Sequence, residues 1–469
     1  MLFQSPDPSR RAVGQKGGHI GERIFQGRSC VINRIAQGRK EVVAMSRFFN
    51  NDQVEVQALL RANQEACVEA CALEGPEEHF LISHDTTDFN FQDHAGLFSV
   101  QDSDLGPTSH QGSEVGFFLH ASVVLKASNT FPLGISDLLL WNRRFGQPTR
   151  QERQYKKLPI EEKESHKWLL NMRTSSQLLS NHAKVTHLMD RDGDIYELFA
   201  EDRLKDHHLL VRQCRERNLA EPTGKVNIWL DQIEPKCSFT LKIKGNDHRR
   251  KRKAKLQLSF GQVTLKRPQT CPKDYPQEIT LSVVQAKEYA HSVPQGEKPI
   301  HWVLYTTHEV EDALSALEVI RWYAARWIIE EFFSLLKTKG LNLEDSQLEQ
   351  GIALKKLCVM SAQVALAIMQ LIKDRHNEYG QSAKLIIRQQ DLAFVYALIK
   401  SLEGNTKAQK NPYPVESLAW LTWAVARLGG WKGYASESPP GPKTMSRGLQ
   451  NFWQRLEGWY LFTGANTFS

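Results

Sequence analysis

Short apolar runs and two helical patterns divide the first half of the chain into alternating predicted elements. Apolar residues between 54 and 73 recur with the period of an amphipathic helix, and a second helical pattern covers 163–181. Runs typical of strands occur at 80–84, 116–127, 132–142, 185–189 and 207–213. Strands, helix, strand, helix and strand in this order predict a mixed α/β fold.

The pattern changes between about residues 215 and 298. Alternating strand-like runs, interrupted by prolines, predict an all-β insertion into the α/β fold. A strand at 301–308 resumes that fold, and a long helix is predicted over 321–340. Beyond residue 373, short apolar helices rich in Trp cannot bury themselves alone, so we expect helix packing or self-association there.

The most apolar segment, 357–372, is shorter than the roughly 20 residues that a membrane-spanning helix needs, and it contains two glutamines, so it predicts a buried helix. The N-terminus lacks the apolar core of a signal peptide. The seven cysteines are an odd number and widely spread, which is typical of a reducing cytosol. We therefore expect a cytoplasmic protein that has no membrane partner.

Positive charge is concentrated in two places. The whole chain carries a net charge of +7, which permits nucleic-acid binding without requiring it. Residues 1–47 hold nine Lys and Arg against three acids, and "HRRKRKAK" at 248–255 holds six basic residues in eight. Six like charges repel each other unless an anion lies across them, so the second cluster indicates either phosphate contact or a solvated loop tip.

Four polar residues share one stripe of the predicted helix 321–340: Tyr323, Arg326, Glu330 and Lys337. At about 100° per residue the stripe is about 60° wide and lies at the edge of the apolar face. A salt bridge between Arg326 and Glu330, four residues apart, would explain part of this pattern without any function. Glu331 lies about 100° away from Glu330, outside the stripe.

Three acidic residues form a candidate metal site. Asp85 and Asp190 each end a predicted strand, and Glu330 lies on the late helix. Carboxylates that converge from separate elements can hold two Mg²⁺ ions, which activate water and stabilise the leaving oxygen of a phosphodiester. Aspartates after strands are also common as turn and cap residues, and Asp192 and Asp194 would cap the helix that follows Asp190.

Three sequence blocks carry a resemblance. "HDTTDFNF" around Asp85, "MDRDGDIYELF" around Asp190 and the pattern Tyr-x2-Arg-x3-Glu-x6-Lys around Glu330 resemble the catalytic blocks of the insertion-sequence-four family of Asp-Asp-Glu transposases, the family of the Tn-five transposase. The similarity runs from about Ser46 to near the C-terminus. It implies a ribonuclease-H-like α/β core with an inserted β domain, a C-terminal dimerisation region and cut-and-paste DNA transposition.

The resemblance also implies roles for individual residues. Asp85, Asp190 and Glu330 would bind two Mg²⁺ ions, for which Mn²⁺ could substitute, and no covalent protein intermediate would form. Tyr323, Arg326 and Lys337 would hold the DNA backbone near the cleaved strand, as a hydroxyl and two cations suit phosphate. Trp302 would stack on a flipped base; without the resemblance it is a core Trp on a strand.

Further basic residues are expected to contact phosphates. Arg191 and Arg212 fall at basic positions of the family, and the cluster contributes Arg250, Lys251, Arg252 and Lys253. The implied partners are double-stranded DNA, as transposon ends and target, and a second copy of the chain in a synaptic dimer. A bacterial cytoplasmic location follows, with nucleoid association when DNA is bound.

Five segments are expected. They are a basic, partly disordered or helical DNA-binding remnant (1–75), the first part of the catalytic core (76–214), the β insertion (215–298), the second part of the core (299–373) and a helical dimerisation region (374–469). Residues 1 to about 45 match the family's end-recognising domain poorly, and Ser334 stands where a close relative in the family has a lysine. Two alternatives therefore stay open: a dimer that inhibits transposition without binding ends, and a nonspecific metal-dependent nuclease.

Overall fold

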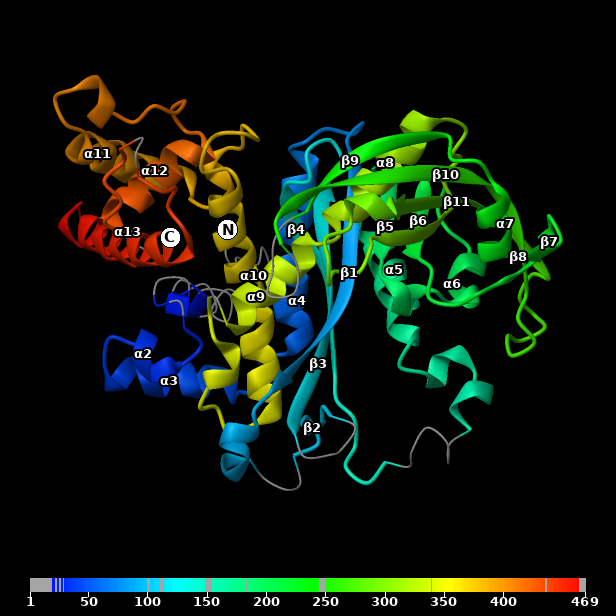
Figure 1. The fold of residues 1–469 in the computed structure, drawn as a ribbon. Helices are drawn as coiled ribbons and strands as arrows, with labels where there is room; N and C mark the ends of the chain where they lie inside the picture. Colours follow the sequence, from blue (N-terminus) through cyan, green and yellow to red (C-terminus); the bar gives the residue numbers. More distant parts are fainter. Residues whose placement is uncertain are drawn as a thin grey trace.

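The computed structural model describes residues 19–463 except 22, 25, 26, 28, 99–101, 110–113, 148–153, 183, 244–249, 339 and 435–436. Several basic residues of the two predicted clusters lie outside this set: Arg10, Arg11, Lys16, Arg28, His248 and Arg249. Within the described residues the chain forms one large mixed sheet with helices on both faces (Figure 1). The predicted α/β class is confirmed.

The sheet has twelve strands, with parallel pairing of β1 with β5 and of β5 with β6 and antiparallel pairing elsewhere. The strands are β1 His79–Asn90, β2 Gly106–Pro107, β3 Val115–Lys126, β4 Pro132–Trp141, β5 Lys184–Met189, β6 His207–Arg212, β7 Asn218–Glu221, β8 Gly224–Lys225, β9 Cys237–Ile243, β10 Arg252–Lys266, β11 Glu278–Glu288 and β12 His301–Thr306. Their order in the sheet is β2-β3-β1-β5-β6-β12-β11-β10-β7-β8, with β4 on β3 and β9 on β10.

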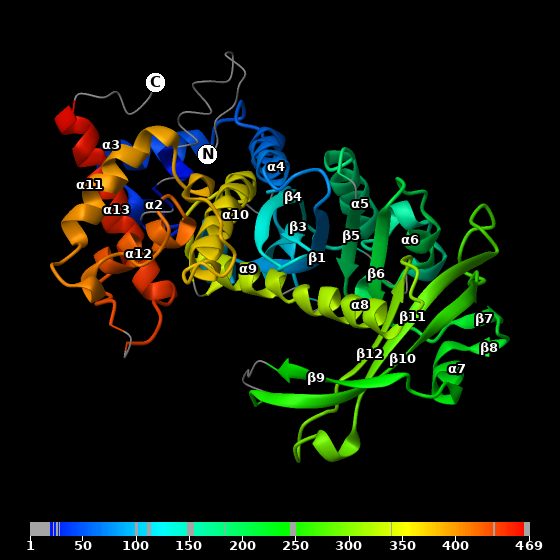
Figure 2. The ribbon, with the colours of Figure 1, turned by 90° about the horizontal axis from the view of Figure 1, so that it is seen from above.

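The α-helices surround this sheet. They are α2 Ile32–Ile35, α3 Arg39–Phe49, α4 Val56–Ala72, α5 His166–Leu178, α6 Tyr196–Ala200, α7 Val226–Gln232, α8 Ala313–Ala325, α9 Ile328–Lys337, α10 Gly351–Lys373, α11 Leu392–Leu402, α12 Leu418–Leu428 and α13 Pro442–Thr463. In both ribbon views α10 lies between the sheet and the group formed by α2, α3 and α11 to α13 (Figures 1 and 2).

Side chains on the two faces of the sheet belong to two separate hydrophobic cores. On β12, Leu304 belongs to the larger core, whereas Val303 and Tyr305 belong to the smaller one. Successive side chains of a strand point to opposite faces, so a sheet covered on both sides produces this division. The larger core contains α4 and α8 to α13, and the smaller one contains α5 and α6.

The segment 215–298 differs from the prediction in two ways. It contains a helix, α7, so it is not all-β. Its strands also continue the main sheet, because β11 pairs with β12, and β12 pairs with β6. Apolar residues on both faces of β10 and β11 need cover on both sides, and α8 packs against both strands.

Close packing of α4 on the sheet depends on a glycine in β4. A Cβ atom added to Gly134 would lie 2.5 Å from the Cys67 sulfur. Cys67 and Cys71 are both buried in α4, as the sequence predicts, and the seven cysteines are all unpaired thiols. Any larger side chain at position 134 would therefore push α4 away from the sheet.

The apolar segment predicted as a buried helix forms the centre of the larger core. Helix α10 is long and apolar enough to cross a membrane by length and composition, but 89% of its most apolar window is buried inside the protein. It contacts α4, β4 and α9. Burial against these elements explains its composition.

We predict a measurable pH dependence of stability from Asp137, which is 7% exposed in β4. Burial raises the pKa of its carboxyl group from 3.8 to about 6, and a hydrogen bond from the Leu138 amide, 3.0 Å long, offsets this only in part. Between pH 3.8 and about 6, the folded state holds a proton on Asp137 that the unfolded state has lost. The free energy of unfolding therefore falls as pH rises through this range, by about 3 kcal/mol in all.

Asp137→Asn removes this titration. We expect the difference in unfolding free energy between variant and wild type, measured by urea denaturation, to become more favourable to the variant from pH 4 to pH 7. Curves that stay parallel over this range would contradict the assignment.

Candidate active site

Parallel pairing of β1 with β5 brings two of the predicted acids together. The register pairs Ser83 with Leu188, and two residues further along each strand lie Asp85 and Asp190. Neighbouring strands lie about 4.8 Å apart, so these carboxylates leave the sheet side by side. The prediction that a strand ends at His84 is wrong, because β1 continues to Asn90 through its antiparallel partner β3.

The third acid comes from a break between two helices. The single helix predicted over 321–340 is divided into α8 and α9, which run one after the other along the sheet (Figure 2). At the break, the amides of Arg326 and Glu330 bond to carbonyls three residues back, at 3.1 and 3.2 Å. The Arg326 carbonyl also accepts a 3.1 Å hydrogen bond from Ser83 Oγ, which ties the break to β1. Tightened turns inside a helix often mark functional positions.

Arg326 joins the acids of β1 and α9. Its Nη1 lies 2.7 Å from Asp85 Oδ2, and its Nη2 lies 3.7 Å from Glu330 Oε1. The predicted salt bridge between Arg326 and Glu330 therefore exists, but across the break between two helices, and the shorter contact is the one to Asp85. Arg326 is 8% exposed, and its Nε has no hydrogen-bond partner among the described residues.

The acids perturb one another electrostatically. Burial raises the pKa of Asp85, the charge of Glu330 adds to this, and Arg326 with the Thr86 amide opposes it. Burial also raises the pKa of Asp190, and the Asp85 charge is the next cause. Asp85 is therefore the shared neighbour of the other two, and like charges gather in a partly buried place.

The donor set suits a hard divalent cation. Carboxylate oxygens are the ligands that Mg²⁺ prefers, and clustered buried acids gain most from a cation. Among the described residues, however, no three His, Cys, Asp or Glu side chains converge closely enough to cage a metal as they stand. Arg326 supplies the positive charge between Asp85 and Glu330 in this arrangement.

The rest of the predicted stripe faces β1 and β12. Lys337 Nζ lies 3.7 Å from Asp88 Oδ1 and 5.5 Å from the centre of the Phe89 ring. Tyr323 is 5% exposed and meets Trp302 edge to face, with 5.2 Å between ring centres. Trp302, Tyr323, Arg326 and Glu330 therefore form a continuous series of neighbours, and Lys337 lies about two turns further along α9.

Two further predicted residues lie at the same end of the sheet. Arg191 is exposed in the turn after Asp190, and Arg212 ends β6, where its Nη2 donates to the His301 carbonyl at 3.2 Å. Burial lowers the pKa of His301, and the charges of both arginines add to the shift. The structure thus brings Arg191 and Arg212 together near β12.

The basic cluster divides by strand periodicity. Lys251 and Lys253 are exposed, and Arg250 precedes them at the end of the loop. Arg252 points to the opposite face, where its Nη2 lies 3.0 Å from Glu288 Oε2 and its Nε lies 3.2 Å from Glu297 Oε2. Alternation of side chains in β10 explains this, and it favours a structural role for Arg252 over the predicted phosphate contact.

Two neighbouring acids have structural partners. Asp194 does not cap α6 as predicted; it forms a buried ion pair with Arg217 and accepts the amides of Cys214 and Arg215 at 2.8 and 2.9 Å. Glu331 Oε2 lies 2.9 Å from Lys373 Nζ of α10. These contacts leave Asp190 and Glu330 as the acids that face Asp85.

Sequence reasoning missed a buried polar chain beside Asp85. Asn171 donates to Ser122, Ser122 bonds His84, His84 bonds His187, and His187 bonds Ser176, at 2.8 to 3.0 Å. Burial lowers the pKa of both histidines well below 6.5, so both rings are neutral. This chain ties β1, β3, β5 and α5 together under the acids. The polar residues at alternate strand positions were its only signal in the sequence.

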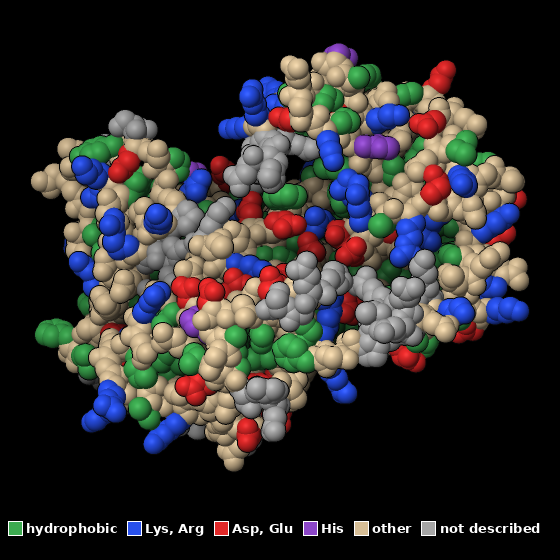
Figure 3. Space-filling model, turned by 60° about the horizontal axis from the view of Figure 1, so that its bottom comes forward, with side chains coloured by type: hydrophobic (Ala, Val, Ile, Leu, Met, Phe, Trp, Pro, Cys, Tyr) green, Lys and Arg blue, Asp and Glu red, His purple; other side chains and the backbone are tan. Residues whose placement is uncertain are grey.

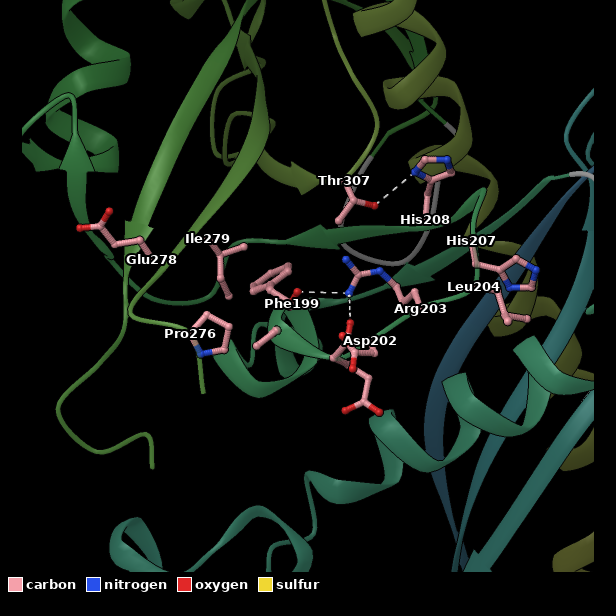
Figure 4. A pocket seen from close by; sticks show the side chains of 12 residues that line it. Phe199, Asp202, Arg203, Leu204, His207, His208, Pro276, Glu278, Ile279 and Thr307 are labelled. Atoms are coloured by element: carbon pink, nitrogen blue, oxygen red, sulfur yellow. Dashed lines mark hydrogen bonds between the residues drawn. The ribbon is translucent and has the colours of Figure 1, made fainter. Parts of the chain in front are cut away.

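A separate cavity of about 450 Å³ lies away from these residues (Figure 4). It is lined by the segment Phe199–Leu204, the start of β6 at His207 and His208, and Glu278 with Ile279. Since β6 runs parallel to β5, its start lies at the end of these strands opposite to Asp190.

On the face shown in Figure 3, acidic side chains gather in a hollow near the middle, and Lys and Arg side chains lie around it.

One comparison with known proteins bears on these residues. Residues 225–367 match the family model of the transposase DDE domain. The matched part contains Trp302, Arg326 and Glu330, and it ends within α10; Asp85 and Asp190 precede it. The match supports a relationship to the DDE transposases and an enzyme that acts on DNA. The large mixed sheet fits the ribonuclease-H-like fold of such enzymes.

We predict that Asp190→Asn stabilises the protein in the absence of divalent ions. The amide keeps the oxygen that accepts the Asp192 amide at 2.8 Å, but it removes a half-buried charge near Asp85. We expect a gain of about 1 kcal/mol in unfolding free energy at pH 7, measured by chemical denaturation. Added Mg²⁺ should stabilise wild type more than the variant. A variant that is less stable than wild type without metal would show that Asp190 acts chiefly as a structural residue.

Proposed function

We propose that the protein is a cut-and-paste DNA transposase of the insertion-sequence-four type, which cleaves transposon ends through a hairpin and joins them to target DNA. The observation that carries the proposal is the approach of Asp85, Asp190 and Glu330 from three separate elements. The match to the transposase DDE domain supports the same class of reaction.

Asp85, Asp190 and Glu330 would hold two Mg²⁺ ions, and Mn²⁺ could replace them. When bound, such ions activate the attacking oxygen and stabilise the leaving oxygen of a phosphodiester. In the proposed sequence, water cuts one strand, the freed 3′ hydroxyl attacks the other strand to form the hairpin, water opens it, and the same hydroxyl attacks the target. The buried chain through His84 and His187 keeps the two aspartates in place during these steps.

Arg326 and Lys337 would hold the phosphates of the strand that is cut. The unpaired Nε of Arg326 is a buried donor that a phosphate oxygen could satisfy. Lys337 contacts Asp88 and Glu344 at 3.7 and 3.8 Å, which are long distances that leave its ammonium group able to turn to a phosphate. Trp302, packed on Tyr323, would offer its free face to a base taken out of the hairpin.

The β9–β10 ribbon supports a role in DNA binding away from the acids. Lys253 lies directly opposite Lys242, and both are exposed. Like charges in this position repel, and a phosphate between them removes the repulsion. We propose phosphate contacts for Arg250, Lys251 and Lys253, and for Arg191 and Arg212 near β12.

The synaptic complex is proposed to be a dimer that assembles on DNA in the bacterial cytoplasm. Leu461 and Phe462 at the end of α13 are 85% and 92% exposed, and apolar side chains so exposed suit contact with a second copy.

An inhibitor that pairs with active copies without binding transposon ends is a second candidate. It is favoured only by the poor resemblance of the first 45 residues to an end-recognising domain. A nonspecific nuclease would not need the ordered Tyr323, Arg326 and Lys337.

We predict that Glu330→Gln abolishes cleavage and leaves DNA binding largely intact. The substitution keeps size and hydrogen bonding but removes one metal-binding charge. The cleavage rate should fall on the order of 1,000-fold, which corresponds to several kcal/mol of lost transition-state stabilisation. The assay incubates full-length protein with Mg²⁺ and a duplex carrying the inverted repeats that flank the gene, and detects hairpin-capped fragments on a denaturing gel.

Glu331→Gln is the matched control, because Glu331 is the adjacent acid and bonds to Lys373. It should cleave at close to the wild-type rate. Nicks without hairpins in wild type would favour the nuclease, and pairing with active copies without DNA binding would favour the inhibitor. Equal loss in both variants would reject the assigned role of Glu330.

A further inference from the structure

A lysine without a role in the proposed function lies at the start of α5. Lys167 Nζ is 5.2 Å from the centre of the Trp141 ring and 5.8 Å from the centre of the Trp168 ring. Cations near indole faces are attracted by the ring quadrupole. Both rings are themselves fixed, since Trp141 stacks on Phe118 at 5.2 Å and Trp168 is 1% exposed. The ammonium group is therefore held in one place by apolar surfaces.

Among the described residues, Lys167 has no carboxylate as a direct partner. In the part of the chain that the structure describes, no ion pair joins it to an Asp or Glu. The nearest acid along the chain, Glu164, is engaged by Arg143, with Nε to Oε1 at 2.6 Å and Nη2 to Oε2 at 2.9 Å. A half-buried charge is costly to keep without a partner.

Helix α5, which carries Lys167, packs against β1 and β3, and Lys167 lies within electrostatic range of the acids of the candidate active site. Burial lowers its pKa, while the charges of Asp192, Glu164, Asp190 and Asp85 oppose that shift. Asp85 already has Arg326 as a partner, but no cation within the described residues forms an ion pair with Asp190. The acids thus have two cations near them. Arg326 is paired with Asp85, and Lys167 has no direct carboxylate partner among the described residues.

The two cations approach from opposite sides of the sheet. Trp168, which contacts Lys167, belongs to the smaller core with α5 and α6. Tyr323, whose ring centre lies 6.0 Å from Arg326 Cζ, belongs to the larger core. A DNA strand laid across the acids would meet one cation on each side.

We propose that Lys167 contacts a backbone phosphate of the DNA strand that is positioned for cutting, on the side of the acids opposite to Arg326. This rests on the proposed function, since it assigns a further residue to the same substrate. The phosphate supplies the anion that Lys167 lacks, and the two indole rings hold the ammonium group ready without neutralising it. Lys167 then acts as a binding and positioning residue.

The test measures how DNA affinity depends on salt, without divalent ions and without cleavage. Full-length wild type, Lys167→Met and Lys167→Arg are titrated into a fluorescent duplex that carries the flanking inverted repeat, at several NaCl concentrations. Loss of one phosphate contact lowers the slope of log K against log [NaCl] by about 0.9. We expect this decrease for Lys167→Met, with affinity at least threefold weaker at low salt, and we expect Lys167→Arg to restore most of both.

Lys184→Met is the matched control. Lys184 Nζ also lies over an indole, 5.9 Å from the Trp322 ring centre, but it starts β5 and so lies at the end of that strand opposite to Asp190. It should keep the wild-type slope. Urea denaturation of each variant separates a folding defect from a lost contact.

The outcomes separate this proposal from the proposed function. A wild type that forms hairpins, together with an unchanged slope in a folded Lys167→Met, would overturn the role of Lys167 alone. Equal decreases for Lys167→Met and Lys184→Met would also overturn it. A wild type that neither binds the duplex in a salt-dependent way nor cleaves it would reject the proposed function, and the role of Lys167 with it.

Discussion

The contact between Arg326 and Asp85 joins residues 241 positions apart in the sequence, and the arrangement of the site depends on it. Asp85 is half-buried near two other acids, and Arg326 opposes the rise in its pKa that burial and the Glu330 charge cause. The tight turns between α8 and α9 deliver that charge, and Ser83 fixes the turn to the same strand that carries Asp85. The ion pair and this hydrogen bond thus tie the start of the helix that carries Glu330 to β1, and the buried apolar face of α9 holds the rest of that helix.

The sheet provides the rigidity that this arrangement needs. Both faces of β5, β6 and β12 are covered, which gives two cores and prevents any one-residue shift in register. A shift by one residue would move Asp190 away from Asp85 and would turn His187 away from His84. The buried hydrogen bonds through these histidines add a polar constraint to the apolar one, since each broken bond would leave a buried polar atom without a partner.

The acidic and basic side chains of the site together suit the binding of an anionic polymer. Asp190 and Glu330 each lie near Asp85, Arg326 lies between Asp85 and Glu330, and Lys337, Arg191 and Arg212 lie on neighbouring segments. Acids alone would repel DNA, and cations alone would bind it without chemistry. The surrounding basic residues offset the repulsion, so a phosphate can approach acids that would otherwise exclude it.

The sequence by itself determined the α/β class, most strands and helices, the buried nature of α10, and Asp85, Asp190 and Glu330 as candidate residues. The elements follow from local periodicity, and the three acids follow from their places in those elements together with the resemblance of three sequence blocks to transposases. Only the tertiary structure decided that β1 continues past Asp85, that the helix breaks at Arg326, and that Arg252 faces inward. Each depends on a partner far along the chain: β3 for β1, Ser83 for the break, and Glu288 for Arg252. Local patterns carry no information about such partners, because long-range pairing and burial are set by the packed fold.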